Sequence, residues 1–147
     1  MTAVTRPTPS TNAAATEMVA GRVQATFITA AEVQPFLKDA RVRILGVSSA
    51  RGSPFVPGVP TIAESGYAGF EAVGWIGIAA PAKTPGPVLD KLNAEMVRIL
   101  GEADVKEKLN TLAFTPVGDT REQFAAYIKS EIAKWGKAVR DSGAKAD

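Results

Sequence analysis

The sequence predicts an α/β fold, and two observations lead to this class. Segments in which apolar and polar residues alternate, as in strands, are separated by segments with the apolar repeat of amphipathic helices. The 147 residues are enough for one domain or two small lobes. Hydrophobic residues make up 46% and charged residues 22%, which is typical of a globular protein that buries a core.

The first part of the chain is expected to alternate helix and strand. A hydroxyl residue can cap the first helix, a glycine can end it, and a proline interrupts the second helix. In order, we expect a helix from Ser10 or Thr11 to Gly21, a strand at 22–28, a short helix at 30–38 that Pro35 interrupts, and a strand at 42–48.

The middle of the chain is rich in proline and glycine. A loop with three prolines leads to Thr61 and Glu64, which have the spacing of a helix capping box, and Gly66 can end that helix. Residues 70–80, "FEAVGWIGIAA", alternate as a strand, and their glycines indicate a bend or a close backbone approach.

The last part is predicted to be helical and to be the best-packed part of the chain. Thr84 can cap a helix that Gly101 ends, and a second helix and a short strand at 114–117 follow. Thr120 and Gln123 form a capping box before a long helix, whose apolar residues are Phe124, Ile128, Trp135 and Val139. We expect Trp135 to lie in the core.

Composition argues against several functions. The chain has 17 Lys and Arg against 15 Asp and Glu without a basic cluster, so no nucleic-acid partner is expected. It has no cysteine and no histidine, which removes the commonest metal ligands and the usual nucleophile and proton-transfer groups. Enzymatic chemistry would have to rest on carboxylates, lysines or hydroxyls, and we expect no catalytic residues, no metal, no cofactor and no enzymatic activity. The apolar runs are too short to span a bilayer.

The segment "GVSSARGSPFVPGVPTIAESGYAGFEAVGWIGIAAPAKTP" resembles a known family. It is similar to the substrate-binding proteins of tripartite tricarboxylate transporters, the Bug family of extracytoplasmic solute receptors. The residues that carry the resemblance are Pro57, Val59, Pro60, Thr61, Glu64, Gly66, Gly69, Phe70, Glu71, Trp75, Gly77, Ala80, Pro81, Thr84 and Pro85. It extends upstream through "EMVAGRVQATF" and downstream through the last helices.

The resemblance implies a fold like that of type II periplasmic binding proteins, in which two α/β lobes close on a ligand. Family members are much longer, so the chain looks like the C-terminal half of such a receptor. On this interpretation residues 1–60 are part of the second lobe, and 61–85 form a hinge or crossing segment. Residues 86–147 form a helical part that packs on the first lobe.

The resemblance also implies where a ligand would bind. Ser10, Thr11 and Asn12 match the family's loop before a helix, where hydroxyls and amides suit an anion, although they also fit an ordinary helix cap. The remaining candidates are Thr29 with the amide of Ala30, Ser48 at the end of a predicted strand, and Trp75 as a lining residue, although a serine such as Ser48 is more often simply solvated.

The resemblance implies that the chain binds a small carboxylate and catalyses no reaction on it. It also implies that membrane subunits of a transporter are its partners. The alternative is a truncated remnant that has lost binding and acts as a structural or self-associating protein, and a homodimer is possible because strands would lack neighbours. The family is periplasmic. The chain carries no recognisable signal peptide, so alone it would be expected to remain cytoplasmic.

Overall fold

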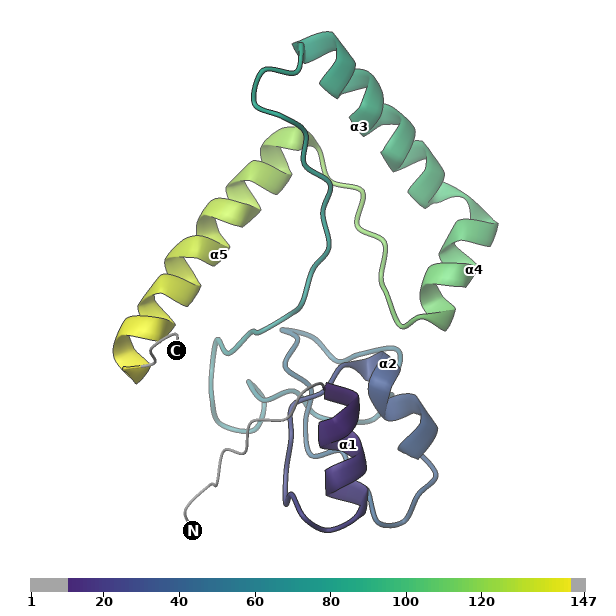
Figure 1. The fold of residues 1–147 in the computed structure, drawn as a ribbon, viewed down its shortest axis with the longest axis vertical. Coiled ribbons are helices and arrows are strands. Elements are labelled where there is room, and N and C mark those ends of the chain that lie inside the picture. The colour runs from purple at the N-terminus through teal and green to yellow at the C-terminus, as the bar shows by residue number, and fades with distance from the viewer. Residues whose placement is uncertain (1–10, 144–147) are drawn as a thin grey trace. The chain divides into compact units, whose positions relative to one another are not determined.

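A computed structural model describes residues 11–143, which fall into two compact units. Unit 1 is Met1–Gly77 and unit 2 is Ile78–Asp147, so the boundary lies within the segment 61–85. The elements are α1 (Thr11–Val19), α2 (Ala30–Val33), η1 (Gln34–Phe36), α3 (Gly86–Gly101), α4 (Ala103–Thr111) and α5 (Arg121–Ser142). Among the described residues, unit 1 contains α1, α2 and a 3-10 turn, and unit 2 contains α3, α4 and α5, of which α3 and α5 are the longest helices (Figure 1).

The helices of unit 1 begin and end close to where the sequence predicts. Gly21 follows α1 with φ +74°, a conformation that favours glycine. The second helix changes from α2 to η1 at Gln34, next to Pro35, which cannot donate a backbone hydrogen bond. α1 packs against α2. The buried apolar residues of these helices are Ala14, Ala15 and Val33, so the contact is small.

The segment 46–48 holds the loops of unit 1 in register. Val47 N–H donates to the carbonyl of Pro60 at 2.9 Å, and Ile62 N–H donates to the carbonyl of Val47 at 3.0 Å. These bonds form a parallel bridge between Val47 and Thr61. On the next residue, the carbonyl of Ser48 accepts from Ala72 N–H at 2.8 Å. Two distant loops are thereby fixed to one short extended segment.

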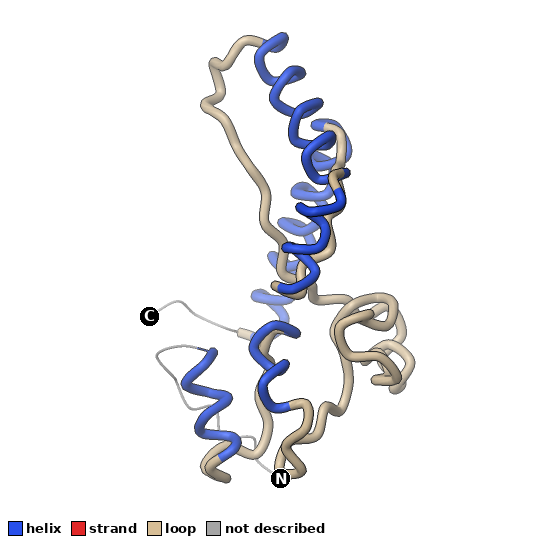
Figure 2. The backbone as a smooth tube through the Cα atoms, turned by 90° about the vertical axis from the view of Figure 1, so that its right-hand side faces the viewer, coloured by secondary structure: helices blue, strands red, loops and turns tan. Residues whose placement is uncertain are grey.

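The predicted strands at 22–28, 42–48, 70–80 and 114–117 are not formed among the described residues. The isolated bridge at Val47 is the only pairing found there, and Figure 2 shows the described backbone as helices and loops. A strand exists only when a neighbouring strand takes up its N–H and C=O groups. The segments with an alternating pattern have no such neighbouring strands among the described residues. The regular structure described is therefore helical, and it does not confirm the predicted α/β class.

Threonine capping boxes form at Thr29, Thr61 and Thr120, of which the sequence predicted those at Thr61 and Thr120 but not the one at Thr29. The first and third begin α2 and α5. At Thr61 both bonds of the box form, but turns follow in place of the predicted helix. Gly66 adopts φ +108°, which ends any helical path after a single turn. The prediction that Thr84 caps α3 is wrong. The N-cap residue of α3 is Pro85, which makes no side-chain capping bond.

Unit 2 is loosely packed, contrary to the prediction that its helices are the best-packed part. Among the described residues, the buried apolar side chains are Ala14, Ala15, Val33 and Val56, all in unit 1. In unit 2, α3 packs on α4. The start of α5 is joined to α3 by the Arg121–Asp90 ion pair and by Asn93, whose amide donates to the carbonyl of Asp119 at 3.0 Å. The regular apolar stripes therefore face outward to a large extent.

Trp135 is half-exposed, so the prediction that it lies in the core is wrong. It retains 46% of its accessible surface, and its Nε1 donates to Glu131 on the same helix at 2.9 Å. We expect Trp135→Ala to reduce the free energy of unfolding of the chain by about 1 kcal/mol or less, the usual scale for surface sites. Chemical denaturation followed by circular dichroism measures this change. A loss of about 3 kcal/mol or more, as for a core tryptophan, would contradict the exposed position.

Among the described helices, none is both long enough and apolar enough to cross a membrane.

Candidate functional site

The predicted ligand-contacting residues all belong to unit 1, except that Ser10 lies outside the described residues. Thr11 and Asn12 are the first two residues of α1, and Ala30 is the first residue of α2. Both helices begin at the same end of unit 1 (Figures 1 and 2). The first-turn N–H groups of helices favour anions. This end of unit 1 is therefore the place where the chain brings two predicted segments together.

Thr29 is a capping residue whose hydroxyl is already engaged. Its Oγ1 accepts from Glu32 N–H at 3.3 Å and lies 2.9 Å from Glu32 Oε2, to which it donates. The same carboxylate oxygen accepts from Thr29 N–H at 2.9 Å. A ligand oxygen that uses the Thr29 hydroxyl must therefore displace the Glu32 carboxylate.

Ser48 and the segment of Trp75 form a second grouping. The Ser48 carbonyl binds Ala72 N–H, which places the start of the 70–80 segment beside the end of the 46–48 segment. Trp75 follows three residues later and retains 45% of its accessible surface. Ser49, which follows Ser48 in the chain, donates from Oγ to the carbonyl of Arg51 at 2.5 Å and so tightens the loop after Ser48. The candidates thus form two groups by position: one at the beginnings of α1 and α2, and one at Ser48 and the segment that its carbonyl binds.

Glu64 has the structural role that the capping-box spacing predicted. Thr61 N–H donates to Glu64 Oε2 at 2.8 Å, and Glu64 N–H donates to Thr61 Oγ1 at 3.0 Å. The backbone N–H of Thr61, and then its side chain, stabilise the charged form and lower the pKa of Glu64 below its ordinary value. Thr61 is 1% exposed, so its side of the box is buried, whereas Glu64 is exposed.

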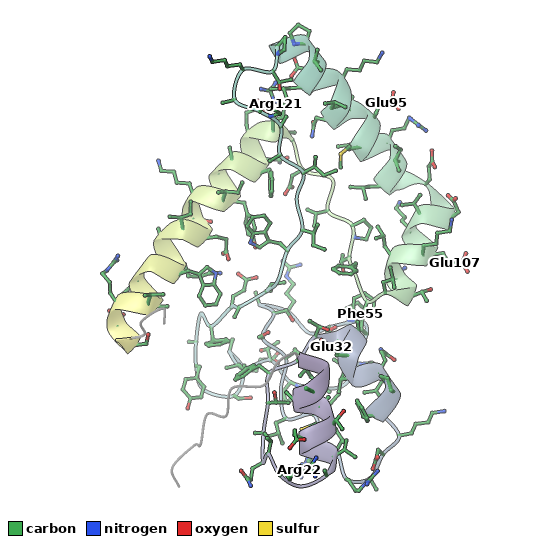
Figure 3. All side chains as sticks on the ribbon, viewed as in Figure 1. Arg22, Glu32, Phe55, Glu95, Glu107 and Arg121 are labelled. Atoms are coloured by element: carbon green, nitrogen blue, oxygen red, sulfur yellow. The ribbon has the colours of Figure 1, made fainter. Side chains whose placement is uncertain are left out.

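Two arrangements were missed by sequence reasoning. Gln34 Nε2 donates to the carbonyl of Phe55 at 3.1 Å, which ties η1 to a loop 21 residues away, and Glu32 and Phe55 lie near one another in Figure 3. No local signal predicts so distant a contact. Glu131 accepts from Trp135 and pairs with Lys134, and the Lys134 bond is the main reason that its pKa is lowered. Here the three- and four-residue spacing on α5 was a usable signal.

Asp39 and Arg41 form a turn-closing ion pair with a testable pH dependence. Asp39 Oδ1 accepts from Arg41 N–H at 3.0 Å, and Oδ2 accepts from the guanidinium at 2.7 Å. The Arg41 side chain is the main cause of the lowering of the Asp39 pKa from 3.8 to about 2, and the Arg41 N–H adds to it.

We expect the stabilisation from Asp39 to be complete above pH 3.8 and to be lost as the pH falls through about 2, because protonation removes the charge that Arg41 binds. A carboxyl titration by nuclear magnetic resonance measures the midpoint. Arg41→Gln should return that midpoint towards 3.8. A midpoint near 3.8 in the unaltered chain would show that the ion pair does not persist in solution.

Within residues 11–143, no cluster of three or more Asp and Glu side chains has the arrangement needed to hold a metal ion. The groups available for recognition are backbone amides, hydroxyls and the Trp75 ring. Such groups can bind and orient a small anion.

The chain matches the family described as the tripartite tricarboxylate transporter family receptor over residues 6–144, and it belongs to that family. The family expectation from sequence is thus confirmed.

The chain is also similar to individual relatives and to a solved structure. A protein of the tcbD–tcbE intergenic region of Pseudomonas sp. strain P51 is 37% identical over 90% of this chain and 40% of its own length. Protein BugT of Bordetella pertussis is 31% identical over 95% of this chain and 43% of its own length. A protein of the clcB–clcD intergenic region of Pseudomonas knackmussii is 29% identical, and 79% of its length is covered.

The structure of R. palustris Rpa4515 with adipate superimposes with a TM-score of 0.72 at 29% identity. The match covers 88% of this chain and 43% of the R. palustris chain. The described part therefore has the fold of the corresponding part of that protein. The chain spans about two-fifths of the length of the Pseudomonas strain P51 and Bordetella relatives.

Proposed function

We propose that this chain supplies one wall of a receptor site for small carboxylates and binds them without chemistry. The observation that carries the proposal is the similarity to the R. palustris protein, whose structure was solved with adipate. Shared fold together with 29% identity over most of the chain supports a related ligand class. The absence of histidine and cysteine from the sequence agrees with recognition by neutral donors.

The ligand would be held by the two groups of unit 1. At the common end of α1 and α2, first-turn amides and the hydroxyls of Ser10, Thr11 and Thr29 would bind a carboxylate, together with Asn12 and the amide of Ala30. Ser48 would donate a further hydrogen bond, and Trp75 would cover the ligand's apolar part. Thr29 would contribute only after its hydroxyl leaves the Glu32 carboxylate, as its hydrogen bonds require.

In a whole receptor, residues 1–60 would belong to the ligand-closing lobe, 61–85 would be the crossing segment, and 86–147 would pack on the other lobe. The partners would be membrane subunits of a transporter of the tripartite tricarboxylate type, as the family's description suggests. The site of action would be the periplasm, where such receptors meet their solutes.

A chimaera tests this proposal directly. The part of the R. palustris protein that matches this chain is replaced by this chain, and the product is titrated with adipate and other small carboxylates. We expect a dissociation constant on the order of micromolar for at least one of them. Ser48→Ala and Trp75→Ala should each weaken binding by about tenfold, because one hydrogen bond or one covered face contributes about 1–2 kcal/mol.

The matched control is Ser130→Ala, which removes an exposed hydroxyl that donates to the carbonyl of Tyr127 within α5. It should leave the affinity unchanged. A folded chimaera that binds none of the carboxylates would overturn the proposal.

A further inference from the structure

The basic side chains of unit 1 differ in whether they have an acidic partner. Arg22 pairs with Glu17 at 2.5 Å, and Arg41 pairs with Asp39 at 2.7 Å. Three further basic side chains in the described part of this unit are exposed and have no ion pair with a described residue: Lys38, Arg43 and Arg51. An anion from outside the chain can therefore reach these three charges.

Among these three residues, Arg51 lies on the loop that hydrogen bonds join to the elements of both groups of candidate residues. It follows Ser48 by three residues, and its carbonyl accepts from Ser49 Oγ at 2.5 Å. On the same loop, the carbonyl of Phe55 accepts from Gln34 at 3.1 Å, and Gln34 begins η1, which follows α2 directly. The backbone around Arg51 is thus held from two sides, while its side chain is exposed.

An exposed arginine on a fixed loop suits the recognition of a carboxylate. The guanidinium is planar and always charged, and its N–H groups match the two oxygens of a carboxylate in a bidentate contact. The donors of the proposed function at the beginnings of α1 and α2 are neutral, and they can take one carboxylate without a cation. Arg51 therefore adds a charge that this first contact does not use.

Trp75 adds an apolar surface on the same side of the candidate site as Ser48. It retains 45% of its accessible surface, and its segment is joined to Ser48 by the bond from Ala72 N–H to the Ser48 carbonyl at 2.8 Å. The chain around Ser48 thus carries a hydroxyl, an aromatic ring and a guanidinium. A ligand that uses all the groups of unit 1 needs one carboxylate, an apolar stretch and a second carboxylate.

We infer that Arg51 contacts the second carboxylate of the ligand, and that the ligands of this site are dicarboxylates whose two carboxylates are joined by an apolar chain. The inference rests on the proposed function, because the first carboxylate lies at the neutral donors of unit 1 and the apolar chain lies against Trp75. It adds a charged contact and a narrower ligand class. A monocarboxylate of the same length binds more weakly, because it leaves Arg51 without a partner.

Nuclear magnetic resonance of the full chain, labelled with nitrogen-15, locates this contact and detects weak binding. The chain is titrated at constant ionic strength with adipate, and separately with hexanoate, which has as many carbons but a single carboxylate. We expect adipate to shift the side-chain Nε–H signal of Arg51 together with backbone N–H signals of unit 1. Hexanoate should shift the backbone signals and move the Arg51 Nε–H signal much less.

The chimaera with the R. palustris protein measures the size of the effect. Arg51→Gln removes the charge and keeps the carbonyl that accepts from Ser49, so the loop is retained. It should weaken adipate binding by about tenfold and leave hexanoate binding unchanged, because a charge-assisted bond contributes more than a neutral one. Arg43→Gln is the matched control, since Arg43 is an exposed arginine outside this loop, and it should leave both affinities unchanged.

The outcomes separate this inference from the proposed function. Backbone shifts in unit 1 without a shift at Arg51, or equal losses for Arg51→Gln and Arg43→Gln, would overturn the Arg51 contact and leave the carboxylate site in place. Equal affinity of the chimaera for adipate and hexanoate would overturn the dicarboxylate class. A folded chimaera that binds neither compound would overturn the proposed function, and this inference with it.

Discussion

Calorimetric titration of the chain alone with adipate, citrate, malate or glutamate is expected to give binding no tighter than about millimolar. The reason is geometric and rests on the proposed site. Donors from unit 1 would contact the ligand from one side and leave its other side in water. Two or three such hydrogen bonds contribute about 0.5–1.5 kcal/mol each. Immobilising a small anion costs about 4 kcal/mol or more, so little net affinity remains.

The chimaera provides the comparison for this titration, because it adds donors from the opposite side without altering unit 1. If the dissociation constant of the chimaera is about a thousandfold lower than that of the chain, the second wall contributes about 4 kcal/mol to the free energy of binding. Micromolar binding by the chain alone would show that the loops of unit 1 form a complete pocket, and the one-wall proposal would then be wrong.

Thr61→Val should be the most destabilising of the capping-box substitutions. Thr61 is 1% exposed and its Oγ1 accepts the Glu64 N–H, so an isosteric methyl leaves a part-buried donor without its partner. Such a loss costs about 1–3 kcal/mol. Thr61 also forms the bridge to Val47, which fixes the loops of unit 1. We therefore expect the free energy of local opening of unit 1 to fall by about 2 kcal/mol.

Native-state hydrogen exchange measures this effect at the N–H groups of Val47, Ile62 and Ala72, which donate the bonds of the register. Their exchange should accelerate by about thirtyfold, the equivalent of about 2 kcal/mol. Thr29→Val is the matched control, since Thr29 has the same capping box at an exposed position. Water can replace its bond, so its effect should be about 1 kcal/mol or less. Equal effects at both sites would contradict the importance of burial at Thr61.

Local features of this protein could be predicted from sequence because they depend on neighbouring residues. The capping bonds of Thr120 and Gln123 form within one turn, and the chain reverses after α1 at Gly21 because glycine accepts a positive φ. The same is true of the Thr61 box, although the helix predicted after it is a turn. The family was also recognisable, since its glycines and prolines lie at fixed spacings between Pro57 and Pro85.

Features that depend on distant partners could not be predicted in this way. The segment 70–80 has a strand pattern, yet a strand forms only when another segment lies alongside it. Within the described residues, this segment has one backbone bond to the 46–48 segment, from Ala72 N–H to the Ser48 carbonyl, and it forms no strand. Trp135 lies on an apolar face, and whether that face is buried depends on what packs against α5.

The sequence alone therefore determined five of the helical segments, the capping boxes at Thr61 and Thr120, and the family of this protein, because each is encoded by residues within a few turns or by fixed spacings in one segment. The tertiary structure decided that Val47 would be the point of register, that the Thr61 side chain would be buried, and that Ile132, Trp135 and Val139 on α5 would be exposed. The physical reason is that burial and strand pairing each require contact between two segments, whereas the pattern of residues in one segment does not say which other segment will contact it.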